Sequence, residues 1–377
     1  MTDTAPAPEI LLERRGPLAV VILNRPKALN ALTLGMIRAL APQLAQWERD
    51  PAVKAVVMRG SGDKAFCAGG DVRAIWEAGR GFQQAGGYDP ATAPDDCLPR
   101  RFFFEEYRLN RQIKLCAKPI VSLLDGVTMG GGCGLSMHGS HRVATERTLI
   151  AMPETAIGLF PDVGGSVFLN ACPGEVGTYL ALTGDRLKGG ADALWCKLAT
   201  HAAPSAAMAA IEERLAGAAW TGDPARDRAV ADAAIAAHAA DPGPSPLSQQ
   251  SAWIDRCFAP ARVEDILAAL ARESGAAAER AAAARKTIET RSPTSLKLTL
   301  AQLRRTRGLG FDQAMATEFR LVQRCMAGHD FFEGIRAVLV DKDQAPRWRP
   351  DRLDAVTDAM IDAYFAPLGP RELTFAD

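Results

Sequence analysis

Two carboxylates stand in a stretch of the chain that otherwise has the composition of a protein core. The stretch is "AMPETAIGLFPDVGG", residues 151–165, and Glu154 and Asp162 are its only charges. A carboxylate among apolar side chains costs free energy unless it is paired or hydrogen-bonded. The same surroundings raise its pKa and make it a usable proton carrier near neutral pH. Both residues are therefore candidate site residues. The alternative is a surface loop whose two acids face water.

Two glycine-rich segments could supply hydrogen-bond donors to such a site. "TMGGGCGLSMHG" (128–139) follows an apolar run, and "KAFCAGGDV" (64–72) repeats the arrangement. Glycines expose backbone N–H groups and let a ligand approach the chain closely, which is what an oxyanion requires. Alternatively, the glycines merely turn the chain. The sequence contains no P-loop, no dinucleotide G-x-G-x-x-G and no G-x-S-x-G nucleophile motif.

A third candidate acid lies in "RFFFEEYRLNRQIKLC". Phe102, Glu106, Leu109 and Ile113 recur at spacings of four, three and four, so Glu106 shares the apolar stripe of a predicted helix, whereas Glu105 points elsewhere. A buried acid with helical packing around it is a candidate site residue. The alternative is a glutamate at the edge of the stripe that reaches solvent.

The elements that must position these residues alternate between strand and helix over the first 200 residues. β-rich runs occupy 18–24, 54–60 and 119–126, and "EILLERR" is predicted to pair with the first run as a hairpin. Thr33 opens an amphipathic helix, and another helix lies between the second and third runs. This alternation predicts an α/β fold with crossover connections.

The composition changes after residue 200. Ala-rich helical sequence is interrupted by "DPGPSPLS" (241–248), and "SPTSLKLTL" then opens further helices with a Ser-Pro start. We predict a chain in four parts. These are a disordered tail over 1–9, a core over 10–200, an Ala-rich helical insertion over 201–290 and a C-terminal helical region over 291–377.

Composition and charge exclude several classes of partner. Lys+Arg and Asp+Glu both number 44, so no net field favours nucleic acid or an anionic membrane. No apolar run approaches the ~20 residues of a membrane span. The eight cysteines have no C-x-x-C spacing, which indicates reduced thiols and argues against a zinc site. The first ten residues lack the features of a signal or transit peptide, so the predicted location is the cytoplasm.

Four motifs in order along the chain resemble the crotonase (enoyl-CoA hydratase/isomerase) superfamily, and within it the 3-hydroxyisobutyryl-CoA hydrolases. They are "NRPKALNAL", "KAFCAGGDV", "GVTMGGGCGLSMHG" and "MPETAIGLFPDVGG". The resemblance covers roughly residues 10–200 and 290–350. It implies a spiral of ββα units ending in helices, an acyl-CoA thioester as ligand, and no metal or redox cofactor. Superfamily relatives often form trimers, which leaves a homo-oligomer open.

The resemblance also assigns residues to the ligand. It implies that the thioester oxygen sits between the backbone N–H groups of Gly70 and Gly131. It places the CoA phosphates near the basic residues of "NRPKA" and the adenine near the 64–71 loop. The CoA-binding residues would then be Arg25, Lys27, Ala68 and Asp71.

One departure from the superfamily pattern indicates the reaction. Hydratases carry two catalytic glutamates; one matches Glu154, but Gly134 occupies the place of the other. Asp162 stands where hydratases have glycine, and the hydrolases resembled here use that Glu–Asp pair with a further Glu matching Glu106. The resemblance therefore implies hydrolysis of a short 3-hydroxyacyl-CoA, namely 3-hydroxyisobutyryl-CoA of valine degradation. The alternatives are a hydratase or isomerase with one acid, and a non-catalytic acyl-CoA binder.

Overall fold

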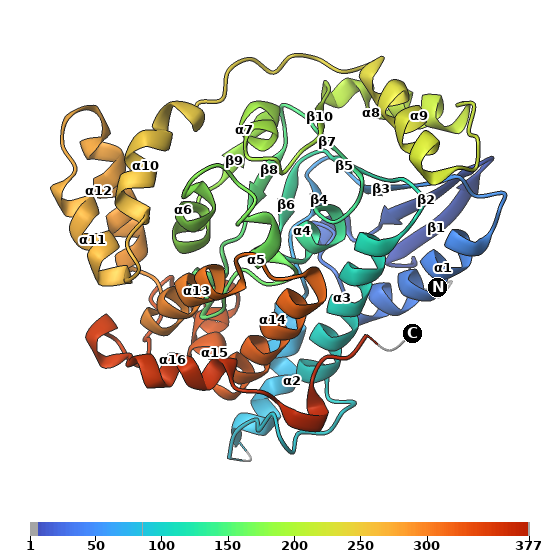
Figure 1. The fold of residues 1–377 in the computed structure, drawn as a ribbon. Helices are drawn as coiled ribbons and strands as arrows, with labels where there is room; N and C mark the ends of the chain where they lie inside the picture. Colours follow the sequence, from blue (N-terminus) through green and yellow to red (C-terminus); the bar gives the residue numbers. More distant parts are fainter. Residues whose placement is uncertain (1–6, 85, 376–377) are drawn as a thin grey trace, which may run out of the picture.

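Two β-sheets form the centre of the molecule, and helices surround them (Figure 1). The computed structural model describes residues 7–84 and 86–375. The larger sheet has the order β1-β2-β3-β5-β7-β10, with strands Ile10–Arg15, Leu18–Leu23, Ala55–Gly60, Ile120–Leu124, His141–Ala144 and His201–Ala202. The smaller sheet has the order β4-β6-β8-β9, with strands Ala65–Cys67, Val127–Met129, Leu149–Ala151 and Leu187–Lys188.

Successive turns of the chain contribute one strand to each sheet. β3 is followed by β4, β5 by β6 and β7 by β8. The pairs β3–β5 and β5–β7 of the larger sheet and β4–β6 and β6–β8 of the smaller sheet are all parallel. β1 and β2 form the predicted antiparallel hairpin, with Ile10 opposite Leu23. This arrangement confirms the α/β prediction and its spiral of ββα units.

The helices of the core follow their sequence signals. The Thr33 side chain accepts a hydrogen bond from the Met36 N–H, which caps α1. The apolar face of α1 is buried, as its spacing predicts. The core helices are α1 (Leu34–Arg49), α2 (Val72–Gln84), α3 (Leu98–Leu115), α4 (Gly131–Ser136), α5 (Gly165–Phe168), α6 (Val176–Thr183) and α7 (Gly189–Trp195).

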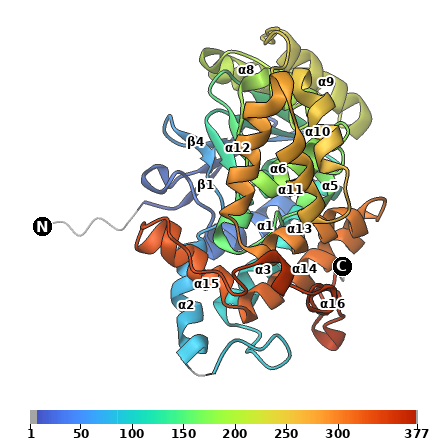
Figure 2. The ribbon, with the colours of Figure 1, turned by 90° about the vertical axis from the view of Figure 1, so that its left-hand side faces the viewer.

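The region 201–290 is not a single insertion. Its first two residues form β10, and α8 (Met208–Ala216) and α9 (Pro224–Ala236) bury Ile211 and Ile235 against the larger sheet. A loop then carries the chain to the opposite side of the molecule, where α10 (Ser251–Phe258), α11 (Val263–Arg272) and α12 (Ala278–Glu289) lie side by side (Figures 1 and 2). Both pieces are Ala-rich, so composition does not reveal that they cover different surfaces.

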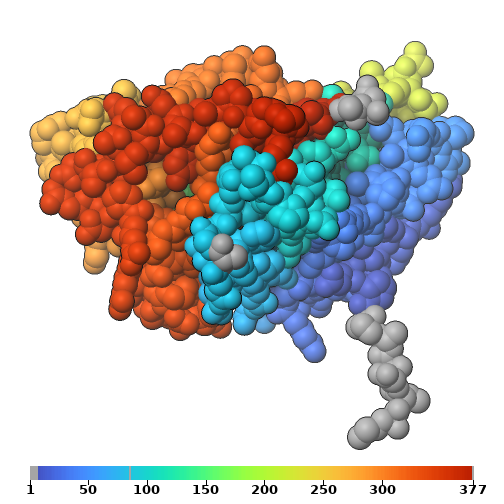
Figure 3. All heavy atoms as spheres, turned by 90° about the horizontal axis from the view of Figure 1, so that it is seen from below, coloured from blue at the N-terminus to red at the C-terminus, as the bar shows by residue number. Residues whose placement is uncertain are grey.

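The C-terminal helices close the remaining side of the core. They are α13 (Pro293–Thr306), α14 (Phe311–Ala327), α15 (Asp330–Ile335), which continues as a π-helix over Arg336–Val340, and α16 (Asp358–Phe365). The segment after α16 runs across α3 (Figure 3), where Arg108 donates a hydrogen bond to the Thr374 carbonyl. The predicted C-terminal helical region is therefore part of the same packed unit as the core.

Two further predictions concern the chain end and membranes. Residues 1–6 of the predicted tail lie outside the described residues. Within residues 7–9, the Glu9 carbonyl accepts a hydrogen bond from the Asn24 N–H and its carboxylate accepts one from Thr33, so ordered contacts begin before residue 10. Among the described helices, none is long and apolar enough to cross a membrane.

Candidate active site

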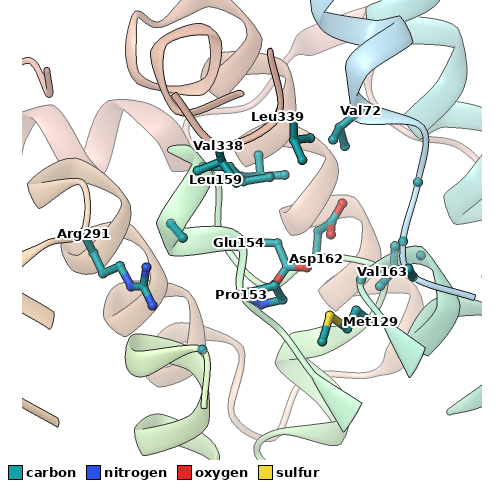
Figure 4. Close-up of a pocket in the computed structure, with 18 of the residues that line it drawn as sticks. Val72, Met129, Pro153, Glu154, Leu159, Asp162, Val163, Arg291, Val338 and Leu339 are labelled. Carbon is teal, nitrogen blue, oxygen red and sulfur yellow. The ribbon is translucent and has the colours of Figure 1, made fainter. Parts of the chain in front are cut away.

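A cavity of about 570 Å³ gathers the acids and glycines that the sequence singles out. Its walls come from the 68–72 loop, α3, the start of α4, the segment 153–163 and the C-terminal region (Figure 4). The predicted residues that line it are Ala68, Gly70, Glu106, Gly131, Glu154 and Asp162. Ala68 and Asp162, for example, are 94 positions apart in the sequence and line the same cavity.

Glu154 begins a short 3-10 turn, η2 (Glu154–Ile157), that ends at Gly158. Gly158 has a φ of 70°, and an added Cβ would lie 2.2 Å from the backbone of Asp330 in α15. Only glycine therefore fits this close approach of two backbones. The turn ends here as its Gly and Pro residues predict, and the chain bends back so that Glu154 and Asp162 lie next to one another (Figure 4).

A strained turn holds Asp162. Val163 has a φ of 52°, which is unusual for a β-branched residue. The His138 ring fixes this backbone, because its Nε2–H donates to the Val163 carbonyl at 2.7 Å. Burial lowers the pKa of His138 to about 4, so the ring stays neutral. The Tyr107 hydroxyl donates to Asp162 Oδ2 at 2.8 Å and orients the carboxylate.

A buried glutamate of α14 anchors the other end of the same turn. Glu318 accepts hydrogen bonds from the Gly164 N–H at 2.7 Å and from the backbone N–H and hydroxyl of Ser166. Gln302 of α13 donates both to Glu318 and to the Pro161 carbonyl. The C-terminal helices therefore determine where Asp162 stands.

Glu106 occupies the buried position that its spacing predicts. It is 2% exposed, and its Oε1 has no hydrogen-bond partner among the described residues. Its neighbour Glu105 lies on the outer side of α3, where it accepts two hydrogen bonds from Arg38. The interpretation of Glu106 as a glutamate reaching solvent is therefore wrong.

Burial of three acids in one cavity raises their proton affinity. Loss of hydration raises the pKa of Glu154 well above its usual value, and the nearby Asp162 charge raises it further. Burial likewise raises the pKa of Glu106, with smaller contributions from Asp162 and Glu154. The pKa of Asp162 rises to about 7 through burial, although the Tyr107 hydrogen bond opposes the rise. Such groups share protons near neutral pH.

The two glycine loops meet at the same cavity. A Cβ added to Gly131 would lie 3.0 Å from the Gly70 nitrogen and 2.7 Å from Glu106 Oε1, so the two loops are in close contact. The N–H groups of Gly70 and Gly131 have no acceptor within the part of the chain that the structure describes. Both are thus available to a ligand oxygen.

The four predicted CoA-binding residues are only partly brought together. Ala68 lines the cavity. Lys27 does not; it lines a smaller pocket together with Lys64. Arg25 and Asp71 form an ion pair at 3.0 Å, which joins the segment around Arg25 to the loop that carries Gly70. Their direct contact with CoA stays a prediction, since the structure gives them a structural role.

Several cavity and supporting residues were not identified from the sequence. Tyr107 adjoins Glu106 on α3, and its position on the buried side could have been noticed from the same helical spacing. Glu318 of α14 and Arg291, in the connection between α12 and α13, lie far along the chain, and no local pattern connects them with the cavity. Among the described residues, no group of three or more His, Cys, Asp or Glu side chains could hold a metal ion.

The fold and cavity define the class of the protein. Two sheets built from ββα turns, with free amides opposite buried acids, are the features of a crotonase-type enzyme acting on an activated carbonyl. The chain belongs to the enoyl-CoA hydratase/isomerase family, whose profile matches residues 18–365.

Similar proteins of known sequence cover almost the whole chain. A protein described as mitochondrial 3-hydroxyisobutyryl-CoA hydrolase from Xenopus laevis is 46% identical over 367 residues, which is 96% of this chain and 90% of that protein. The human protein of the same description is 45% identical over 375 residues, covering 99% and 92% of the two chains.

Two solved structures share the fold closely. The structure described as a carnitinyl-CoA dehydratase from Mycobacterium thermoresistibile has a TM-score of 0.86 and 40% identity, covering 97% of this chain and 98% of its own. The structure described as an enoyl-CoA hydratase from Rhodobacter sphaeroides has a TM-score of 0.84 and 37% identity, covering 98% and 100%.

The predicted cytoplasmic location is contradicted by these relatives, because the curated proteins at about 45% identity are described as mitochondrial. That prediction depended on the amino-acid pattern of the first ten residues. Six of those residues lie outside the described part of the structure, so the pattern has no structural support.

The packing around Gly134 gives a first prediction. A Cβ at this position would lie 2.8 Å from the Val163 Cβ, closer than such atoms pack. Gly134→Ala should lower the free energy of unfolding by about 1–3 kcal/mol, as overpacking does, and should reduce kcat/KM by displacing the Asp162 turn. Urea unfolding and a thioester assay measure the two effects.

The control is the double variant Gly134→Ala with Val163→Gly, which removes both Val163 atoms that the new methyl group meets. Compared with Val163→Gly alone, the double variant should lose less stability than Gly134→Ala loses compared with the parent. A Gly134→Ala protein with parental stability and kcat/KM would show that this contact does not restrict the site.

Proposed function

We propose that this enzyme hydrolyses a short 3-hydroxyacyl-CoA thioester, 3-hydroxyisobutyryl-CoA, to 3-hydroxyisobutyrate and CoA, a reaction of valine degradation. Relatives about 45% identical over nearly their full length carry that description. The observation in the structure that supports it best is the absence of room at Gly134. The second glutamate of a hydratase does not fit beside Val163, and Asp162 supplies the second carboxyl group instead.

The free amides of Gly70 and Gly131 act on the carbonyl. As an oxyanion hole they hydrogen-bond the thioester oxygen and stabilise the negative charge that forms on it when the carbonyl carbon is attacked. Loss of one such donor typically costs about 3–4 kcal/mol of transition-state stabilisation. The cavity favours these hydrogen bonds because its apolar walls, including Phe102, Leu159 and Leu339, limit access of water.

Glu154 is the group that brings the new oxygen to the carbonyl. Its carboxylate either removes a proton from water or attacks the carbon to give a mixed anhydride that water then cleaves. In both routes the C–S bond breaks, the proton goes to the CoA sulfur and one water molecule is consumed. Asp162 accepts the hydrogen bond of the substrate 3-hydroxyl or of the water, and Glu106 exchanges protons with this pair.

The alternative functions differ in what they do to the thioester. A hydratase changes the absorbance of an enoyl-CoA without releasing thiol, and a non-catalytic binder does neither. We expect thiol release from 3-hydroxyisobutyryl-CoA and essentially no hydration of crotonyl-CoA. Glu154→Gln should reduce thiol release at least ~100-fold while CoA still binds, as loss of a general base does.

The matched control is Glu105→Gln, which removes a carboxylate from the neighbouring helix surface and should retain parental activity. Efficient hydration of crotonyl-CoA by the parent would contradict the hydrolase assignment. Thiol release by Glu154→Gln at a near-parental rate would instead remove Glu154 from the chemistry.

The raised proton affinity of the acids predicts the pH dependence. The reactive carboxylate of Glu154 forms only as its proton leaves, and burial raises the pKa of Glu154, so kcat/KM should rise with pH through an inflection above the usual range of a glutamate. Asp162→Asn removes the charge that raises the pKa of Glu154, so the inflection should move to lower pH. Profiles measured from pH 5 to about 9 test this; a flat parental profile would contradict it.

A further inference from the structure

A second cavity, of about 470 Å³, adjoins the catalytic one and shares Gly184, Arg186 and Arg291 with it. It lies between the end of α6 and α12. In Figure 4, Arg291 stands on the far side of Glu154 and Asp162 from Val72. The catalytic cavity therefore has two ends, one at the 68–72 loop and the other at these arginines.

Three guanidinium groups, those of Arg186, Arg280 and Arg291, line the second cavity. Over residues 7–84 and 86–375, none of the three has a carboxylate within ion-pair distance. The carboxylate in the cavity wall, Asp185, already accepts hydrogen bonds from the Tyr179 hydroxyl and the Arg186 N–H. The space therefore carries excess positive charge with donors free for an anion.

The geometry of Arg291 connects this charge to the catalytic cavity. One of its terminal nitrogens donates to the Thr183 carbonyl at 2.9 Å, which fixes the guanidinium at the junction of the two spaces. Its Nε is buried and has no hydrogen-bond partner in the described structure. A buried donor without a partner costs free energy, and a carboxylate oxygen arriving from the catalytic side would supply one.

We infer that this arginine-lined cavity binds the carboxylate of the acid product and provides its exit, separate from the end through which CoA leaves. The inference rests on the proposed hydrolysis, which turns an uncharged thioester carbon into a carboxylate beside Glu154 and Asp162. Repulsion from those acids and attraction to the arginines drive the product in the same direction. Guanidinium groups suit this role because they hold carboxylates through paired hydrogen bonds.

Product inhibition tests the assignment. Sodium 3-hydroxyisobutyrate and CoA are used separately as inhibitors, with loss of thioester absorbance as the readout. The variant is Arg186→Gln with Arg280→Gln, and the fold should stay intact because both residues are exposed. The inhibition constant of the acid should rise about tenfold, as loss of charge-assisted hydrogen bonds predicts, while that of CoA should change less than about twofold.

The control is Arg285→Gln. Arg285 lies on α12 like Arg280 but forms an ion pair with Glu289 at the surface, so its loss should alter neither inhibition constant. A rise in the CoA constant with an unchanged acid constant would assign the arginines to CoA phosphates and overturn the inference. Two unchanged constants would also overturn it.

Direct binding of the acid can be measured whether or not the parent hydrolyses the thioester. If the parent does not hydrolyse 3-hydroxyisobutyryl-CoA, the proposed function fails. Calorimetric titration of the parent and of the double variant with 3-hydroxyisobutyrate gives the dissociation constant of the acid for each protein. Equal affinity of the two proteins for the acid would overturn the inference, and weaker binding by the variant would support it.

Discussion

Three carboxyl groups are buried in the wall of one cavity, and the surrounding structure keeps them there. Each would be more stable at the surface, so the free energy of folding must come from elsewhere in the chain. Glu106, Glu154 and Asp162 arrive from a helix, a 3-10 turn and a strained loop. Rigid packing around each element holds the acids together despite their mutual repulsion.

The C-terminal helices supply much of that packing. Glu318 of α14 and Gln302 of α13 hold the turn that carries Asp162, and the backbone of Asp330 presses against Gly158 behind Glu154. The helical region is therefore part of the catalytic architecture rather than an appendage. A destabilising change in α14 should alter the position of Asp162 even though the helix is distant from it in sequence.

Local patterns in the sequence predict the elements and the three acids but not their supports. Helical spacing distinguishes Glu106 from Glu105, because only Glu106 falls on the apolar face of the helix. The apolar residues around Glu154 and Asp162 indicate directly that these two acids are buried. Tyr107, His138 and Glu318 act through contacts made only when distant segments meet. The ion pair of Arg25 with Asp71 is likewise a contact that no local pattern predicts. The Ala-rich region forms two groups of helices, α8–α9 and α10–α12, which pack on different sides of the core. Its composition is similar in both groups and does not predict this division.

Burial of the three site acids should let them keep protons to unusually high pH, and their ionisation can be measured directly. Carbon-13 NMR of protein labelled at the Asp and Glu carboxyl carbons follows each titration, with Glu106→Gln, Glu154→Gln and Asp162→Asn assigning the signals. We expect Asp162 to titrate near pH 7, and Glu154 and Glu106 to titrate well above their usual range. Complete ionisation of all three below about pH 5, as for exposed acids, would contradict it.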